Sequence, residues 1–309
     1  MSIRFDDRVA IVTGGAIGLG RAHALGLAER GAKVVVNDLG AASDGTGGAV
    51  SAAQAVADEI IAAGGEAMAH GADVTDEAQV ADMVAQTLDR WGRIDILINN
   101  AGILRDKTFA KMTLADFKTV VDVHLIGTAT VTHAVWPIMR AQKYGRIVLT
   151  ASSSGIYGNF GQSNYGAAKT GMLGLMNVLH QEGARDDIRV NTLAPTATTR
   201  MTEELFPPPV GELLQPETIT PGVLYLVSED GPSRVILGAG GGCFAQIRVY
   251  ETEGITLSGN ALTPETVAEQ FAHVTDPTGQ RELTQAFEQT NKYAEKAAAA
   301  NGVSLKSED

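Results

Sequence analysis

Short apolar runs rich in β-branched residues alternate with longer amphipathic segments along most of this chain. The runs occupy residues 8–14, 32–38, 66–74, 93–102, 145–152, 188–195 and 233–240. Between them, apolar residues recur at helical spacing, as in residues 76–92. Strands that are apolar throughout and separated by helices are typical of a parallel sheet covered on both faces. We therefore predict one α/β domain over residues 1–250, a Rossmann-type doubly wound sheet of seven parallel strands.

The last part of the chain has a different character. Residues 252–262 have the composition of a linker, and Thr263-Pro264-Glu265 has the cap and first-turn proline of a helix start. Apolar residues at Val267, Phe271, Leu283 and Phe287 predict two short helices. Because this segment is too small to fold alone, we predict that residues 251–309 are a linker and a helical extension that packs on the body or on a partner subunit.

Two short segments rich in proline or glycine predict connections. Residues 206–210, with three consecutive prolines, predict a loop that is neither a helix nor a central strand. The glycine cluster at residues 238–242 predicts a structural turn and not a phosphate loop, because no helix clearly follows it.

Composition narrows the possible functions. The net charge of −12 argues against general binding to nucleic acid, which needs a basic surface. The single cysteine, Cys243, excludes an intrachain disulfide and a CxxC metal site, and we expect it to be buried or half-buried. No signal-peptide pattern begins the chain and no apolar run is long enough to span a bilayer. We therefore predict a cytoplasmic protein with no membrane contact and no metal.

A glycine-rich turn follows the first predicted strand. Gly14, Gly18 and Gly20 allow a tight turn that brings a pyrophosphate close to a helix N-terminus. Asp38 ends the second predicted strand, where a carboxylate binds both ribose hydroxyls and repels a 2′-phosphate. No arginine or lysine lies within the turn. These residues predict a site for NAD in preference to NADP; the alternatives are a bare glycine turn and a capping aspartate.

Two polar segments follow later strands. Residues 99–102, NNAG, end the fourth predicted strand, where they either pin the middle of the sheet beside a cofactor or form a simple turn. Asp73 either binds an adenine amino group or caps the helix that follows it.

Tyr165 and Lys169 are spaced to lie one turn apart on one helix face. A free tyrosine titrates near pH 10, and a neighbouring ammonium favours the phenolate. The pair therefore has the chemistry to exchange a proton with an alcohol or a carbonyl. Ser152, at the end of the fifth predicted strand, would bond the same substrate oxygen. Alone, Tyr-x-x-x-Lys occurs on many surface helices by chance.

In this order, TGxxxGxG, NNAG, Ser-x12-Tyr-x3-Lys and NTLAP resemble the classical short-chain dehydrogenase/reductase family over about residues 5–245. VVVNDLG with the glycine-rich residues 40–48, NNAGILRDKTFAKM and QKYGRIVLTASSSGIYGNFGQSNYGAAK resemble one branch. That branch is the (3R)-hydroxyacyl-CoA dehydrogenase unit of the peroxisomal multifunctional β-oxidation enzyme type 2, together with its bacterial single-unit relatives.

The resemblance implies roles for particular residues. Tyr165 would be the general acid/base, Lys169 would lower its pKa and hold the nicotinamide ribose, and Ser152 would orient the substrate oxygen. The residues implied to bind NAD are Gly14, Ile17, Gly18, Leu19, Gly20, Asp38, Asp73, Val74, Asn100, Ala101, Gly102, Tyr165, Lys169 and Thr198. The implied substrate is an acyl-CoA thioester, and the implied assembly is a homodimer or homotetramer.

Two positions depart from the classical pattern. His124 stands where the family usually has an asparagine that holds a proton-relay water, so either an imidazole keeps the relay or the histidine is simply packed. Thr196 stands where the family usually has a glycine. The basic residues Arg105, Lys107 and Lys111 either contact CoA phosphates or form a solvated face.

Three functions follow as expectations. The first is hydride transfer between a nicotinamide and C3 of a (3R)-hydroxyacyl-CoA. The second is the same chemistry on another secondary alcohol, such as a steroid, because fold does not fix substrate. The third is a non-catalytic NAD-binding regulatory or scaffold protein, which the intact set of Ser152, Tyr165 and Lys169 argues against.

Overall fold

The computed structural model describes residues 2–47, 51–200, 202 and 206–305. The chain divides into two compact units, Met1–Ile247 and Arg248–Asp309. Gly48, at the end of the glycine-rich stretch noted above, lies outside the described residues.

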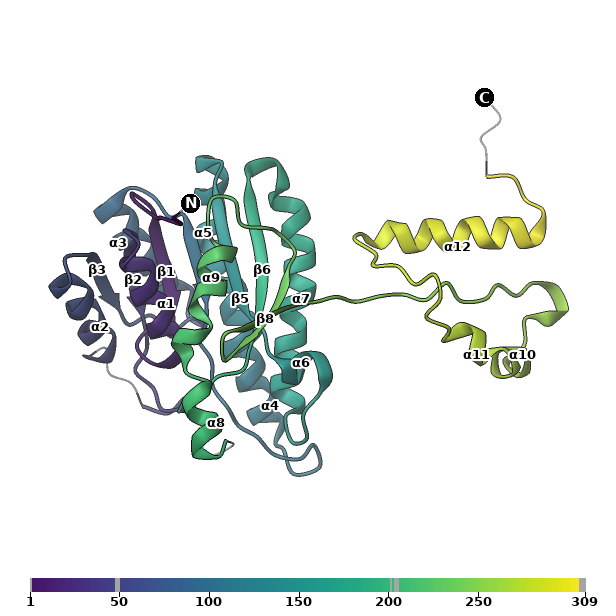
Figure 1. The fold of residues 1–309 in the computed structure, drawn as a ribbon, viewed down its shortest axis with the longest axis horizontal. Helices are drawn as coiled ribbons and strands as arrows, with labels where there is room; N and C mark the ends of the chain where they lie inside the picture. Colours follow the sequence, from purple (N-terminus) through teal and green to yellow (C-terminus); the bar gives the residue numbers. More distant parts are fainter. Residues whose placement is uncertain (1, 48–50, 201, 203–205, 306–309) are drawn as a thin grey trace. The chain divides into compact units, whose positions relative to one another are not determined.

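One sheet forms the centre of the first unit (Figure 1). Its strands are β1 (Val9–Thr13), β2 (Lys33–Asn37), β3 (Glu66–His70), β4 (Ile96–Asn99), β5 (Gly145–Thr150), β6 (Ile188–Pro195), β7 (Ile236–Gly240) and β8 (Cys243–Ile247). They lie in the order β3-β2-β1-β4-β5-β6-β7-β8, and β1 to β7 pair in parallel. The predicted doubly wound sheet is confirmed. Because the strand order reverses between β1 and β4, their crossovers diverge and leave a crevice at the carboxyl ends.

The eighth strand is a feature that the sequence did not predict. β8 pairs antiparallel with β7 across a two-residue turn in which Gly241 (φ 56°) and Gly242 (φ 77°) are left-handed. Glycine suits such a turn because both positions need positive φ. The glycine cluster is therefore a turn, as predicted. Cys243 is exposed, however, contrary to the prediction, because it begins an edge strand in which four of the five residues are exposed.

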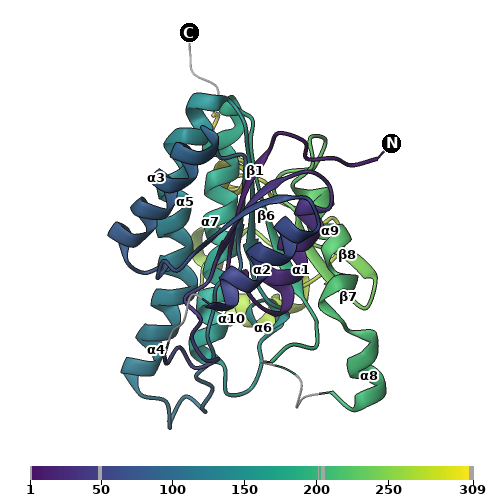
Figure 2. The same ribbon diagram turned by 90° about the vertical axis from the view of Figure 1, so that its left-hand side faces the viewer.

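Helices cover both faces of the sheet (Figure 2). α1 (Gly18–Ala28), α2 (Ser51–Ala62) and α9 (Thr220–Leu226) pack on one face, and α3 (Glu77–Trp91), α5 (Gly127–Gln142) and α7 (Ser163–Gly183) pack on the other. Successive strand residues serve opposite faces: Val34 and Val36 join the first cluster, and Val35 joins the second. This double burial is the physical reason for the unbroken apolar runs in the sequence.

Shorter elements complete the first unit. They are α4 (Leu114–Val121), a π-helical turn (Asp122–Ile126), α6 (Ser153–Tyr157), α8 (Pro208–Leu213) and single 3-10 turns at Ala184–Asp186 and Pro216–Thr218. The proline-rich residues 206–210 are not the predicted loop, because α8 begins at Pro208 with Pro207 at the N-cap. Prolines fit there since the first amide groups of a helix have no partner within the helix.

The second unit contains α10 (Pro264–Glu269), α11 (Phe271–Val274), a 3-10 turn (Gly259–Ala261) and α12 (Ala286–Asn301). Thr263 caps α10, as predicted, and its Oγ1 accepts a bond from the N–H of Thr266 (3.2 Å). The prediction of two short helices is wrong, because the alanine-rich end of the chain extends α12 to 16 residues. Lys292, buried within this unit, donates to Glu251 Oε1 (3.0 Å). Packing of this unit on the body or on a partner stays a prediction.

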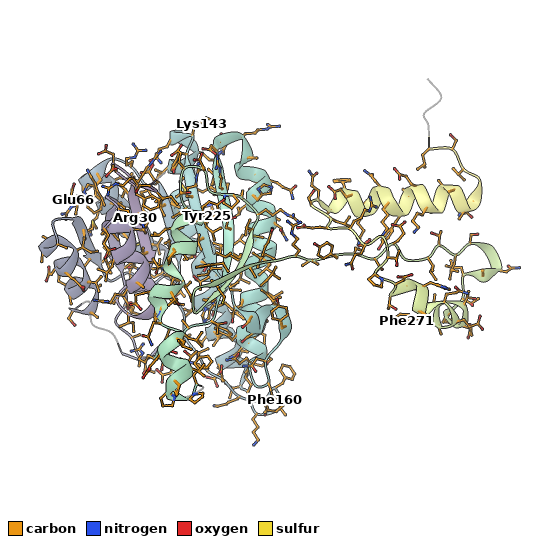
Figure 3. The ribbon with its side chains drawn as sticks, in the orientation of Figure 1. Arg30, Glu66, Lys143, Phe160, Tyr225 and Phe271 are labelled. Atoms are coloured by element: carbon orange, nitrogen blue, oxygen red, sulfur yellow. The ribbon has the colours of Figure 1, made fainter. Side chains whose placement is uncertain are left out.

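Large apolar side chains also lie on the surface, one by one. Phe160, between α6 and α7, is 89% exposed, and Phe271 in the second unit is 55% exposed (Figure 3). In the described part of the chain, no helix has the length and apolar character needed to cross a bilayer.

Candidate active site

The glycine turn between β1 and α1 has a backbone that only glycine fits. Gly14 (φ 62°) and Gly18 (φ 55°) are left-handed. A Cβ at Gly20 would lie 2.0 Å from the carbonyl oxygen of Gly14, so α1 packs directly on the turn. Ile17, at the N-cap, makes no capping bond. The first amide groups of α1 therefore suit an anionic ligand.

The NNAG segment holds the ends of β1 and β4 together. The Asn100 side chain donates to the carbonyl oxygens of Thr13 (3.2 Å) and Gly14 (3.0 Å). The Thr13 hydroxyl accepts from the backbone N–H groups of Asn100 (3.0 Å) and Ala101 (3.1 Å). The segment thus pins the middle of the sheet to the glycine turn and is more than a simple turn.

Asp38 lies at the end of β2 and faces the same region. Its Oδ2 accepts from the N–H of Ala16 (3.0 Å), and its Oδ1 accepts from the N–H of Gly40 (2.8 Å). These bonds fix the carboxylate between the glycine turn and the loop that follows β2.

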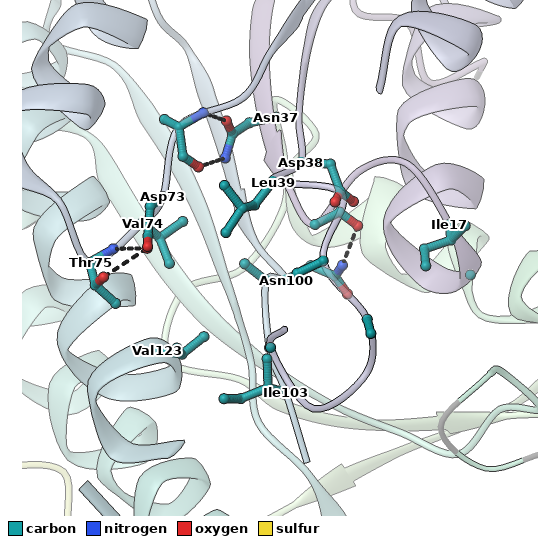
Figure 4. A pocket seen from close by; sticks show the side chains of 18 of the residues that line it. Ile17, Asn37, Asp38, Leu39, Asp73, Val74, Thr75, Asn100, Ile103 and Val123 are labelled. Atoms are coloured by element: carbon teal, nitrogen blue, oxygen red, sulfur yellow. Dashed lines mark hydrogen bonds between the residues drawn. The ribbon is translucent and has the colours of Figure 1, made fainter. Parts of the chain in front are cut away.

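A cavity of about 410 Å³ opens at these strand ends (Figure 4), a size suited to a small-molecule ligand. The residues predicted to bind NAD that line it are Gly14, Ile17, Gly18, Leu19, Asp38, Asp73, Val74, Asn100, Ala101 and Gly102. Gly20, Tyr165 and Lys169 do not line it; Gly20 acts instead through the close packing of α1. Among the described residues, no group of three His, Cys, Asp or Glu side chains is placed to bind a metal ion.

Asp73 lines the cavity without capping α3. Its Oδ1 accepts from the N–H (2.9 Å) and hydroxyl (2.7 Å) of Thr75, whereas Asp76 caps the helix. This geometry leaves the adenine-binding alternative for Asp73 and removes the capping one.

Thr198 lies outside the cavity lining, so its part in binding NAD stays a prediction. Its hydroxyl donates to the carbonyl oxygen of Gly211 (3.0 Å) in α8. The next residue, Thr199, lines the cavity, and a Cβ at Gly18 would lie 3.4 Å from its Cγ2. Because the chain after β6 is irregular here, motif spacing does not show which of two adjacent threonines faces the ligand.

Ser152, Tyr165 and Lys169 meet just beyond the carboxyl end of β5. Ser152 is the N-cap of α6, and its hydroxyl hydrogen-bonds the phenol of Tyr165. The ammonium nitrogen of Lys169 lies 5.4 Å from the centre of the Tyr165 ring and donates to the carbonyl oxygen of Thr150. A Cβ at Gly155 would lie 2.8 Å from that of Lys169, so glycine lets α6 pack closely on α7.

Burial dominates the ionisation of this group. It raises the pKa of Tyr165, the hydrogen bond from Ser152 opposes the rise, and the charge of Asp106 adds to it. Burial also lowers the pKa of Lys169 to about 7. The sequence predicts that Lys169 lowers the pKa of Tyr165, but the net direction in the structure is upward. Loss of water around each side chain is the largest cause of both shifts.

His124 connects the cavity to Tyr165. It is buried in the π-helical turn, and its ring meets Tyr165 edge-on at 5.1 Å between centroids. Its Nε2 lies 2.7 Å from the carbonyl oxygen of Ile103, a cavity residue, and a Cβ at Gly102 would lie 2.1 Å from its Cε1. Burial and the charge of Lys169 lower the pKa of His124 well below its ordinary value, so the ring is neutral. The histidine is therefore tightly packed, and a relay role stays a prediction.

The basic residues after β4 are mostly engaged with acids. Arg105 Nη1 lies 3.3 Å from Asp116 Oδ1, and Lys107 Nζ lies 3.6 Å from Asp116 Oδ2. Arg105 also donates to the carbonyl oxygen of Asp44 (3.0 Å). These contacts favour a structural role for Arg105 over contact with CoA phosphates, while Lys111 is exposed.

The sequence analysis did not predict several of the residues that line the cavity. They are Asn37, Leu39, Ala41, Ala42, Gly45, Ala72, Thr75, Ile103, Thr119, Asp122, Val123, Thr199 and Arg200. The glycine-rich stretch after β2 was a usable signal for the loop residues. No local pattern marks Arg200, because its position depends on the path of the chain after β6.

Comparison with known proteins agrees with this geometry. The family model described as short chain dehydrogenase matches residues 8–209. A short-chain type dehydrogenase/reductase of Mycobacterium tuberculosis is 44% identical over 88% of this chain and 96% of its own length. The solved full-length peroxisomal multifunctional enzyme type 2 of Drosophila melanogaster is 36% identical, with a TM-score of 0.81 over 97% of this chain and 50% of its own.

Another similar structure is a 7α-hydroxysteroid dehydrogenase complexed with NADH and 7-oxo glycochenodeoxycholic acid. It is 29% identical, with a TM-score of 0.70 over 77% of this chain and 95% of its own. The chain spans between 31% and 61% of the length of the curated peroxisomal relatives that it matches.

Proposed function

Because this chain belongs to the short-chain dehydrogenase family and is a nicotinamide-dependent oxidoreductase, we propose that it interconverts (3R)-hydroxyacyl-CoA and 3-ketoacyl-CoA thioesters with NAD. One observation carries the proposal. Ser152 and Tyr165, with the Lys169 ammonium 5.4 Å from the Tyr165 ring centre, are linked through His124 to a cavity that is lined by an acidic residue, Asp38.

The cavity suits a dinucleotide. The left-handed Gly14 and Gly18 leave room for a pyrophosphate beside the N-terminus of α1, and Asp38 and Asp73 line the part expected to hold adenosine. When bound, the nicotinamide supplies the hydride acceptor or donor. Asp38 supports NAD over NADP because its carboxylate would lie against a 2′-phosphate.

Proton transfer falls to Tyr165. With its pKa raised by burial, the side chain is a neutral phenol near pH 7, the state that donates a proton during reduction of a 3-ketoacyl group. Ser152 would hold the substrate oxygen through the same hydroxyl that bonds the phenol. Oxidation needs the phenolate, so its rate is expected to increase with pH.

The substrate class rests on similarity to enzymes named as peroxisomal hydratase-dehydrogenase-epimerases and peroxisomal multifunctional enzymes. A second candidate, oxidation of a steroid alcohol, is favoured by the similarity to a hydroxysteroid dehydrogenase. A purely regulatory NAD-binding protein is disfavoured because Ser152, Tyr165 and Lys169 are all present and close together.

The test is to mix purified protein with NAD⁺ or NADP⁺ and each enantiomer of a 3-hydroxyacyl-CoA, while following nicotinamide absorbance. Reduction of NAD⁺ with the (R)-thioester alone is the expected result. Activity on steroid alcohols and none on either thioester would replace the proposed substrate. Tight NADH binding without turnover of any alcohol would favour the regulatory alternative. We further propose a cytoplasmic homodimer or homotetramer, which fractionation and light scattering would test.

A further inference from the structure

The loop that follows β2 encloses one side of the cavity. Ala41, Ala42 and Gly45 of this loop line it. The loop is tied to the segment after β4, where the N–H of Leu104 donates to the carbonyl oxygen of Ser43 (2.9 Å). A Cβ at Gly45 would lie 3.2 Å from Ile103 Cγ2, so the loop packs closely on a cavity residue. The connections after β2 and β4 therefore pack on each other at the cavity.

The chain after β6 contributes two residues to the cavity lining, Thr199 and Arg200. The Nη2 of Arg200 donates to the carbonyl oxygen of Ala41 (3.2 Å). The guanidinium therefore links the connection after β6 to the connection after β2, two segments on either side of the β1 turn in the sheet order.

The charges that line the cavity are mostly negative, and Arg200 opposes them. Three acids line the cavity, Asp38, Asp73 and Asp122, and Arg200 is the one basic side chain in the described part of the lining. The whole chain carries a net charge of −12. A dinucleotide brings two further negative charges on its pyrophosphate, so a single cation within the lining has a large share in making the site accept it.

The position of Arg200 matches the place where that pyrophosphate is expected. Its neighbour Thr199 lies against Gly18, the first residue of α1. The uncapped amide groups at this helix start are the expected pyrophosphate site. Arginine also has a planar fork of donors, which lets one side chain bond a carbonyl and a phosphate together.

We propose that Arg200 binds the pyrophosphate of the cofactor while it holds the loop after β2 over the cavity, and so determines how tightly the cofactor is retained. The inference rests on the proposed function, because it takes the ligand to be a nicotinamide dinucleotide. It assigns binding, and no part in the chemical step, to Arg200.

The test compares Arg200→Gln and Arg200→Lys with the unaltered protein by calorimetric titration of NADH, ADP-ribose and adenosine. Arg21→Gln is the matched control, because Arg21 is a partly exposed arginine that bonds Glu59 and does not line the cavity. Arg200→Gln should raise the Kd of NADH and ADP-ribose about 10- to 100-fold, the effect of losing a charge-assisted hydrogen bond. Adenosine, which has no phosphate, should lose much less affinity than ADP-ribose, because only the hold of Arg200 on the loop after β2 affects it.

Arg200→Lys should recover part of the lost affinity, and the difference between Arg200→Gln and the unaltered protein should shrink at high salt. Equal loss for adenosine and ADP-ribose would overturn the inference, since Arg200 would then act only through the loop. Unchanged ADP-ribose affinity in Arg200→Gln would overturn it as well. If the unaltered protein bound neither NADH nor ADP-ribose, the proposed function would fail, and the inference with it.

Discussion

Replacement of Lys169 by methionine should change how the stability of the cofactor-free protein depends on pH. Lys169 is 2% exposed, and burial lowers its pKa from 10.5 to about 7. The unfolded chain therefore binds this proton more tightly than the folded protein does. Between about pH 7 and 10.5, Lys169 is mostly neutral in the folded protein and mostly protonated in the unfolded chain. The free energy of unfolding should therefore rise with pH in this range, because the unfolded chain binds more protons.

The size of the effect follows from the two pKa values. Each unit of pKa difference corresponds to about 1.4 kcal/mol. Between pH 7 and 9.5, the unaltered protein should gain about 3 kcal/mol relative to Lys169→Met. For a domain of this size, that corresponds to a relative rise in Tm of about 6–12 °C. Tyr165 does not interfere in this window, since its raised pKa reduces stability only above about pH 10.

The assay is thermal unfolding of both proteins, without cofactor, at intervals from pH 6.5 to 9.5. Methionine keeps the length and apolar stem of the side chain, so loss of the bond to Thr150 contributes equally at each pH. The control is Lys118→Met, because Lys118 is exposed and its ammonium is solvated in the folded and unfolded chain. A constant difference between Lys169→Met and the unaltered protein across the range would refute the reasoning and mean that buried Lys169 keeps its charge.

Three further predictions concern the site. Tyr165→Phe should lower turnover about 10²- to 10⁴-fold while NADH affinity, measured by fluorescence titration, stays nearly unchanged; substantial residual turnover would remove Tyr165 from its role. Asp38→Asn should lower the NAD⁺/NADP⁺ ratio of kcat/KM about 10- to 100-fold, because it removes a charge that would face the 2′-phosphate; an unchanged ratio would place the preference elsewhere. Gly102→Ala should cost about 1–3 kcal/mol of stability and lower turnover, because its Cβ would meet the His124 ring at 2.1 Å. Gly174→Ala, with open space around it in α7, is the control and should be neutral or stabilising.

The sheet was predictable because double burial leaves a strong signal. The central strands β1, β4 and β5 are buried on both faces and are therefore apolar almost throughout, and the segments between strands repeat at helical spacing. β8 gave no such signal, since most of its residues are exposed at the edge of the sheet. The loop predicted at residues 206–210 was wrong for a different reason. Prolines are excluded from the interior of a helix, but they fit its first turn, where α8 begins.

The site was predictable where backbone geometry demands one residue type. Gly14, Gly18 and the spacing to Asp38 belong to this class, because left-handed φ and close packing leave few alternatives. Thr198 and Arg200 show where prediction of the site from the sequence fails. Their chain segment has no repeating geometry, so one residue faces the cavity and its neighbour does not. The direction of the Tyr165 pKa was also beyond sequence reasoning, because burial is a property of the assembled fold.

The π-helical turn at Asp122–Ile126 has a consequence for how this site can arise and be lost. Such a turn holds one residue more than an α-helical turn between the same two helices. Deleting a single codon within it would restore a continuous α-helix, which redirects the side chains of the turn itself while the flanking helices keep their orientation. His124 would then no longer reach the carbonyl of Ile103. One deletion is therefore enough to break the link that His124 makes between Ile103 and Tyr165, even though His124 is buried.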